Sequence, residues 1–227
     1  MIRNALAPVC LAWLVLHLAG CGGPPPPPPP PGMGLLEERL HHAAADGDLP
    51  AAERALAQGA SLRARGRYRQ TALHVAAFEG RREIVVLFLG RGAELEARTE
   101  TGLTPLHAAA QNGHRQVAAV LLQAGASLAA LDADGRTPLH MAAQNAHTAV
   151  ARLLIEAGAD ARLRNQAGET PLHLAALAGD RALAKLLLAR GADAHALDRE
   201  GHTPLAVARE NGHADLAEML RKHGADR

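Results

Sequence analysis

Thr-Pro-Leu-His, at residues 104–107, returns at 137–140 and again at 170–173, each time after 33 residues. The variants Thr-Ala-Leu-His at 71–74 and Thr-Pro-Leu-Ala at 203–206 keep the same step. A Gly-Ala pair repeats in the same register, at 59–60, 92–93, 125–126, 158–159, 191–192 and 224–225. Two markers with one spacing indicate a chain of stacked units, and such stacks form extended binding surfaces.

The unit at 134–166 has the signals of two helices joined by a turn. Thr137 is a good N-cap, and Pro138 follows at the first helical position, where its missing N–H costs nothing. Residues 150–155 supply the broad apolar face of a second helix. Gly158 is placed to end that helix in the left-handed conformation. The unit therefore predicts a helix-turn-helix that begins after a polar turn.

This unit resembles the ankyrin repeat, which places a β-hairpin finger before two antiparallel helices and carries a Thr-Pro-Leu-His-x-Ala box. The resemblance implies an all-α repeat solenoid of six units. We expect a signal segment at 1–20, a tether at 21–34, a degenerate first cap at 35–67, repeats at 68–100, 101–133, 134–166 and 167–199, and a C-terminal cap at 200–227.

The end units carry polar residues where the others are apolar. Arg54 stands where later units have Leu or Val, Arg209 replaces Ala, and Arg221 replaces Leu or Ile. Terminal repeats face water on one side, so these residues are typical of caps. In the ankyrin family the box histidine bonds toward the adjacent finger. No finger follows Ala206, which favours a structural role for the histidines His74, His107, His140 and His173.

Two positions depart from the repeat. Arg69 replaces the glycine of the other finger turns, and Ala146 replaces the glycine between the two helices of a unit. A left-handed non-glycine costs on the order of 1 kcal/mol. We expect an irregular, basic first finger, to which Arg63, Arg65 and Arg67 also belong, and local strain in the fourth unit.

The first residues resemble a bacterial lipoprotein signal. Basic Arg3 precedes an apolar run at 5–18, which is shorter than the roughly 20 residues of a membrane span. Leu-Ala-Gly-Cys at 18–21 resembles the lipobox, which implies that Cys21 becomes an acylated N-terminus. The alternative is an ordinary cleaved signal followed by a coincidental cysteine. Gly22, where an Asp would favour retention in the inner membrane, implies an outer-membrane lipoprotein that faces the periplasm.

Eight prolines at 24–31 form the tether. As polyproline II they extend roughly 25 Å, which suits a spacer between a membrane and a domain; a ligand for a proline-binding module is the alternative. Cleavage would remove Cys10, and acylation would occupy Cys21, so no thiol or disulfide is expected in the repeats.

Composition and motifs argue against several chemistries. A formal net charge of +1 and 2% aromatic residues do not favour a nucleic-acid partner. Box histidines on neighbouring units are too far apart to share zinc, because packed helices lie about 8–10 Å apart. The serines fall in Gly-Ala-Ser stretches that the repeat explains. We therefore expect no catalytic residue, no metal site and no cofactor.

Binding is the function that remains. The resemblance implies a concave face made of finger tips and the exposed ends of first helices. By matching position, the expected partner-binding residues are Arg67, Tyr68, Gln70, Phe78, Glu79, Leu103, Gln111, Asn112, Arg136, Gln144, Asn145, Glu169, Leu177, His202 and Glu210. Tyr68 and Phe78 are the expected anchors, since interface hot spots favour aromatic residues. The alternative is that Phe78 packs against its neighbouring unit.

The sequence thus predicts a monomeric, non-enzymatic scaffold in the bacterial cell envelope, anchored to a membrane by its N-terminal lipid and capturing a protein partner. An exported or surface-displayed effector is one alternative. An immunity-type protein that blocks an envelope toxin is another, and an enzyme or metal carrier is the least favoured.

Overall fold

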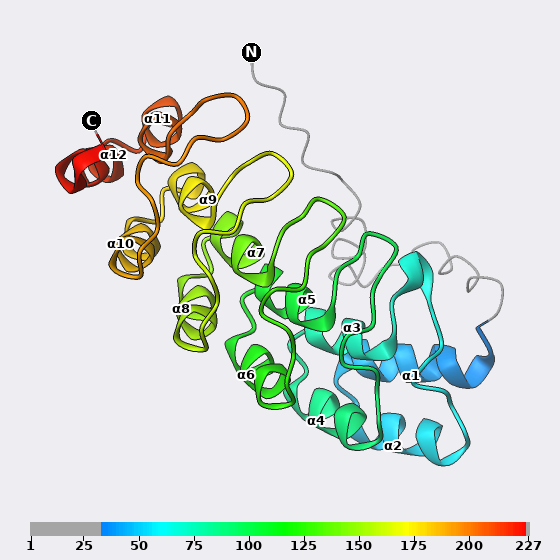
Figure 1. Cartoon of the computed structure of the whole chain (residues 1–227). Helices are drawn as coiled ribbons and strands as arrows, with labels where there is room; N and C mark the ends of the chain where they lie inside the picture. Colours follow the sequence, from blue (N-terminus) through cyan, green and yellow to red (C-terminus); the bar gives the residue numbers. More distant parts are fainter. Residues whose placement is uncertain (1–32, 226–227) are drawn as a thin grey trace, which may run out of the picture.

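The computed structural model describes residues 33–225. Six helix-turn-helix units stack in chain order, with their finger loops on one side (Figure 1). The first helices form an inner row beside the fingers: α1 (Leu35–Asp46), α3 (Ala72–Phe78), α5 (Pro105–Gln111), α7 (Pro138–Gln144), α9 (Pro171–Ala178) and α11 (Pro204–Glu210). The second helices form an outer row: α2 (Leu49–Ala57), α4 (Arg82–Gly90), α6 (Arg115–Gln123), α8 (Thr148–Glu156), α10 (Arg181–Ala189) and α12 (Ala214–Leu220).

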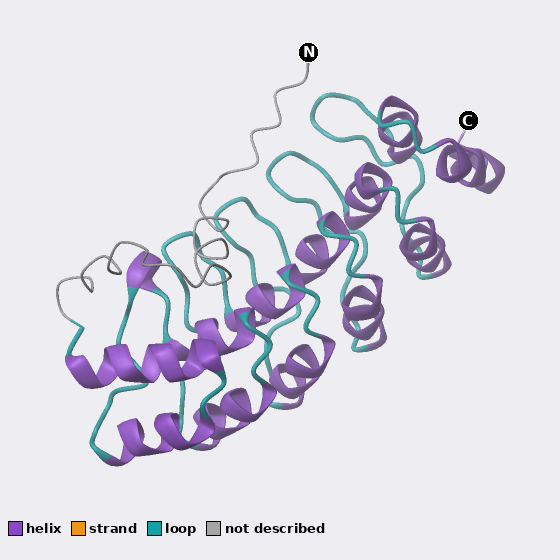
Figure 2. Ribbon diagram, turned by 180° about the vertical axis from the view of Figure 1, so that it is seen from behind, coloured by secondary structure: helices purple, strands orange, loops and turns teal. Residues whose placement is uncertain are grey.

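The expected all-α repeat solenoid is confirmed. Each inner helix packs on the next inner helix, and each outer helix on the next outer helix, so the two rows run the length of the stack (Figure 2). Short η segments occur at Arg67–Arg69 and Arg221–Ala225. Among residues 33–225, no helix is both long and apolar enough to cross a membrane. The predicted signal, Cys21 and the proline tether lie outside the described residues.

The local helix signals act as predicted. Thr137 is the N-cap of α7, and Pro138 is its first residue. The Thr137 hydroxyl accepts a hydrogen bond from the backbone N–H of His140 at 3.4 Å, which satisfies one of the free N–H groups at the helix start. Gly158 follows α8 with a φ of 100°. The turn, the two helices and the terminator are therefore confirmed.

A single apolar core extends from α1 to α12. Paired alanines on the inner helices are fully buried and allow close approach, at Ala76–Ala77, Ala109–Ala110, Ala142–Ala143 and Ala175–Ala176. Phe88, on the outer helix α4, is also fully buried. The outer positions equivalent to Arg54 are half-buried rather than buried, at Leu87, Val120, Leu153 and Leu186. These side chains stay partly exposed because the convex side of the outer row has no covering layer.

The fingers are turns rather than β-hairpins with strands. Within a finger, Asp132 N–H donates to the Arg136 carbonyl at 3.0 Å. Between fingers, Ala133 N–H donates to the Thr101 carbonyl at 2.8 Å. Hairpin-like pairing is present, but in residues 33–225 no pair of arms is long enough to form strands.

Both expected departures are visible in the backbone. Ala146 has a φ of 55°, and Arg69 has a φ of 57°. Tyr68, beside Arg69, also has a positive φ, at 53°. At the C-terminal end, Arg209 and Arg221 are exposed, as expected for a cap.

Candidate functional site

The expected binding residues form two rows along the side of the stack that carries the fingers. The finger row directly precedes each N-cap threonine and consists of Gln70, Leu103, Arg136, Glu169 and His202. The helix row lies at the end of each inner helix and consists of Phe78, Gln111, Gln144, Leu177 and Glu210. Each row takes one residue from each of five successive units, and its side chains differ in charge and polarity from unit to unit.

The box histidines fix the backbone of the finger row. His107 Nδ1 accepts a hydrogen bond from Thr104 N–H at 3.2 Å, so this nitrogen carries no proton. Nε2 therefore carries the proton and donates to the Arg136 carbonyl at 3.0 Å. The same bond joins His74 to Leu103, His140 to Glu169 and His173 to His202. The predicted structural role of these histidines is confirmed.

Burial keeps these imidazoles neutral. Desolvation lowers the pKa of His74 and of His140 to about 4, against an ordinary value of 6.5. It also lowers the pKa of His107 and His173. A neutral ring keeps Nδ1 free to accept the hydrogen bond from the N-cap threonine. Its Nε2–H group can then donate to the carbonyl of the next finger.

A second set of histidines fixes the backbone of the helix row. His114 Nε2 bonds the Phe78 carbonyl at 2.7 Å, and His147 Nε2 bonds the Gln111 carbonyl at 3.0 Å. His213 bonds Leu177 in the same way at 3.1 Å. These three histidines directly precede second helices and reach 36 residues back, which sequence reasoning missed. The sequence feature that could have revealed this shared role is their spacing, in multiples of the 33-residue repeat.

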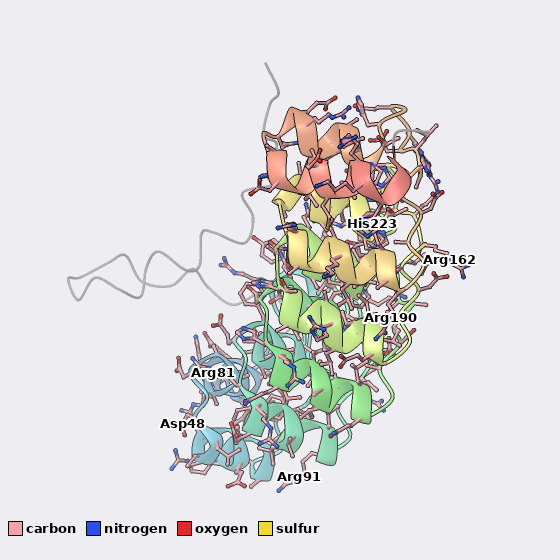
Figure 3. The ribbon with its side chains drawn as sticks, turned by 90° about the vertical axis from the view of Figure 1, so that its left-hand side faces the viewer. Asp48, Arg81, Arg91, Arg162, Arg190 and His223 are labelled. Carbon is pink, nitrogen blue, oxygen red and sulfur yellow. The ribbon has the colours of Figure 1, made fainter. Side chains whose placement is uncertain are left out.

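The equivalent position in the other units carries a different side chain. Arg81 Nε donates to the Ala45 carbonyl at 2.8 Å, and Figure 3 shows this arginine near the turn that holds Asp48. Asp180 instead accepts from Leu183 N–H at 2.9 Å and caps its own helix. Asp180 also bonds the hydroxyl of Thr148. The helix-row carbonyl of Gln144 therefore has no imidazole from the following unit.

Arginines form a third connection between units, and sequence reasoning missed it. Arg65 Nη1 donates to the Arg98 carbonyl at 3.1 Å. Arg98 and Arg164 likewise donate to the carbonyls of Leu131 and Leu197. Each bond links one finger to the next, 33 residues on. These bonds tie together three of the four pairs of neighbouring fingers, which limits the entropy lost on binding.

In the centre of the face, one arginine links the two rows. Arg136 Nη2 lies 2.8 Å from Asp132 Oδ2 and 2.9 Å from Asp134 Oδ2. Its Nη1 donates to Gln144 Oε1 at 3.4 Å. The Asp132 side chain is only 1% exposed and also accepts from the N–H groups of Asp134 and Arg136. Because this carboxylate is fully satisfied, it acts as a fixed support for Arg136.

The sixth unit presents an acidic surface around His202. Its ring lies 3.3 Å from Asp198, 3.7 Å from Glu200 and 3.9 Å from Glu210. Glu200 and Glu210 are exposed, so the carboxylates can reach a partner. Within residues 33–225, no group of three or more His, Cys, Asp or Glu side chains is arranged to hold a metal ion.

Family comparisons agree with this geometry. A family model of ankyrin repeats in three copies matches residues 84–165 and 157–227, and a second ankyrin-repeat model matches residues 40–89. The chain belongs to the ankyrin-repeat family. No curated protein matches it. Ankyrin repeats typically serve as non-enzymatic protein-interaction modules, so membership indicates a protein-binding scaffold.

The residues expected to bind a partner differ in how much of their surface is exposed to solvent. Tyr68 is 50% exposed and Leu177 is 42% exposed. Phe78 is half-buried and packs against the apolar core. Asn112 and Asn145 donate their amides to carbonyls four residues back, at 3.0 Å and 2.9 Å. The two asparagines therefore also satisfy helix C-termini.

The remaining expected residues lie close to the two rows. Arg67 is exposed at the tip of the first finger, and Glu79 is half-buried just after α3. Arg162, outside the rows, points into solvent from the loop after α8 (Figure 3), where it pairs with Asp160 at 3.1 Å. The face is a shallow surface of separate side chains, which suits contact with a protein.

Proposed function

We propose that this ankyrin protein is a non-enzymatic scaffold of the bacterial cell envelope, anchored by a lipid on Cys21, which captures a protein partner on its finger and helix rows. The observation that carries the proposal is the contrast between fixed backbone and varied side chains. Histidines bond the carbonyls of Leu103, Arg136 and Glu169, while the side chains of these residues differ. Such a surface can be specific without reordering on binding.

The envelope location rests on the sequence alone. A lipobox-like stretch, a polyproline spacer and repeats without cysteine are together consistent with an outer-membrane lipoprotein facing the periplasm. Incorporation of labelled palmitate into the full chain, and its loss in Cys21→Ser, would support the anchor. Equal labelling of both proteins, or labelling of neither, would contradict it.

Partner capture can be tested with charge insertions on the two sides of the stack. Gln111→Arg/Leu177→Arg alters the helix row in the third and fifth units. Gln116→Arg/Ala182→Arg adds the same charge to exposed outer-helix positions of the same units. We expect crosslinking in envelope fractions to yield a partner with the wild type and with the outer variant, and to lose it with the helix-row variant.

The other outcomes are equally informative. Capture that is equal in all three proteins would overturn the assignment of binding to the concave face. No partner from a folded, anchored protein would overturn the scaffold function. Circular dichroism and urea unfolding of each variant establish that the comparison is between folded proteins.

A further inference from the structure

The tip of the first finger differs from the other four tips in charge. Residues 67–70 read Arg-Tyr-Arg-Gln, with two guanidinium groups and no carboxylate. The tips at 100–103, 133–136, 166–169 and 199–202 each contain at least one Asp or Glu. The whole chain has a formal net charge of only +1, so this excess of positive charge is local.

Neighbouring side chains do not neutralise the tip. Arg65, lower in the same finger, pairs with Glu94 at 2.9 Å. Arg67 and Arg69 are exposed, and within residues 33–225 neither guanidinium has an ion-pair or side-chain hydrogen-bond partner. The residues on either side of Tyr68 therefore each carry a solvated guanidinium group, and Tyr68 itself is 50% exposed.

The backbone of this tip is strained. Tyr68 and Arg69 have φ values of 53° and 57°, where the next finger has Gly102 at 77°. The left-handed conformation is unfavourable for residues other than glycine, because Cβ then approaches the following carbonyl oxygen. The tip still joins the finger ladder, because Glu100 N–H donates to the Tyr68 carbonyl at 2.8 Å. Strain in an otherwise supported turn is a feature found at functional sites.

The first finger also lacks the imidazole bond that holds the other four. Nε2 of His41, the box histidine of the first unit, is buried without a hydrogen-bond partner. Helix α1 begins at Leu35 and runs through Glu38, where later units place their N-cap threonine, so no threonine orients the His41 ring. The first tip therefore lacks one of the bonds that join the other four tips to the preceding unit.

We propose that the tip formed by Arg67, Tyr68 and Arg69 docks an acidic segment of a protein partner. The two guanidiniums bind carboxylates of that segment, and the Tyr68 ring packs on an apolar side chain between them. Arginine forks match carboxylate geometry, and Tyr and Arg dominate interface energetics. This inference rests on the proposed scaffold function and names the chemistry of its partner.

A protein segment fits better than an anionic membrane surface. The neighbouring tip, one hydrogen bond away, carries exposed Glu100. A flat anionic surface would meet both tips together and be repelled by this carboxylate, whereas a narrow peptide can contact the first tip alone. Charge complementarity on that scale also speeds encounter with the partner.

The test is selection of random peptides of about 12 residues, displayed as a library, on the immobilised full chain. We expect the wild type to enrich peptides with an excess of Asp and Glu beside an apolar residue. Arg67→Glu/Arg69→Glu should abolish that enrichment. Arg115→Glu/Arg181→Glu, which reverses two exposed charges on outer helices, should keep it. Tyr68→Asn, which tolerates positive φ, should weaken a selected peptide about tenfold.

Three results would overturn the proposal. One is no acidic enrichment by the wild type, and another is acidic enrichment that survives the reversal at the tip. The third is tip-dependent binding to vesicles of anionic phospholipid without peptide enrichment. The envelope capture experiment tests the scaffold function separately. If it yields a partner but the full chain selects no acidic peptides, the scaffold function stands and the role of this tip is contradicted. If the full chain selects acidic peptides but envelope capture yields no partner, only the scaffold function is contradicted.

Discussion

The imidazole of His147 lies directly against Gly113: a Cβ atom on this glycine would stand 2.6 Å from the ring's Nδ1. The same approach joins Gly80 to His114 at 2.5 Å. This turn must therefore carry glycine for two reasons, its positive φ and the ring against it. Ala146 has a Cβ at the equivalent place, and the residue facing it is Asp180 instead of a histidine. Alanine in place of glycine at 146 and aspartate in place of histidine at 180 therefore form a matched pair.

The matched pair predicts a thermodynamic coupling. Ala146→Gly alone should raise the free energy of unfolding by about 1 kcal/mol, because it relieves a φ of 55°. Asp180→His alone should lower it, because the ring meets the Cβ of Ala146. The double substitution should exceed the sum of the single ones by about 1 kcal/mol, because the introduced imidazole can then bond the Gln144 carbonyl. Urea unfolding of the four proteins measures the cycle, and additivity would contradict the pairing.

The box histidines should matter only where a finger follows. His140→Ala removes a partly buried bond to the Glu169 carbonyl and a buried bond to Thr137, so we expect a loss of about 2–3 kcal/mol of unfolding free energy. Ala206→His restores the box, but among residues 33–225 no finger lies beyond it to accept the bond, so we expect stability to change by less than about 0.5 kcal/mol. Urea unfolding compares the two. A large gain from Ala206→His would show that the finger bond is not the source of the stability.

Stability should fall as the solution becomes acidic. His41, His74 and His140 have folded pKa values of about 4, below the 6.5 of an ordinary imidazole. Between pH 6.5 and 4 the unfolded chain therefore binds more protons, and unfolding becomes more favourable as pH falls. Each pKa unit between the folded and the unfolded value changes the free energy of unfolding by about 1.4 kcal/mol. Urea unfolding at about pH 8, 6 and 4.5 should show the decline.

The acid effect has its own control. His74→Gln and His140→Gln should each flatten the pH dependence while lowering stability at about pH 8, because glutamine does not titrate in this range. His195→Gln, at an exposed histidine, should leave the dependence unaltered. An unchanged slope in the box variants would assign the acid sensitivity to other groups.

The first finger should show a conflict between stability and binding. Arg69→Gly restores the residue of the other fingers and relieves a φ of 57°, so we expect a gain of about 1 kcal/mol in unfolding free energy. The same change removes one guanidinium and should weaken a selected acidic peptide at least about threefold. Thermal unfolding and fluorescence anisotropy measure the two effects. A loss of stability would argue against backbone strain at this tip.

Sequence alone predicted the features that are local or simply repeated. Thr137, Pro138 and Gly158 act within one or two helical turns of their own positions, and a 33-residue period carries those signals from unit to unit. The exposure of Arg209 and Arg221 was predictable for a related reason, because these arginines replace apolar residues of the other units. The finger row and the helix row, which we propose for binding, were predicted from the family resemblance.

Contacts between units were decided only by the tertiary structure. His147 reaches Gln111 36 residues back, and Arg65 reaches Arg98 33 residues on, although nothing near either residue in the chain marks its target. Such contacts depend on the rotation and rise between stacked units and on the side-chain rotamers that fit there. For the same reason the half-burial of Phe78 and the unpaired Nε2 of His41 emerged only when the units were stacked.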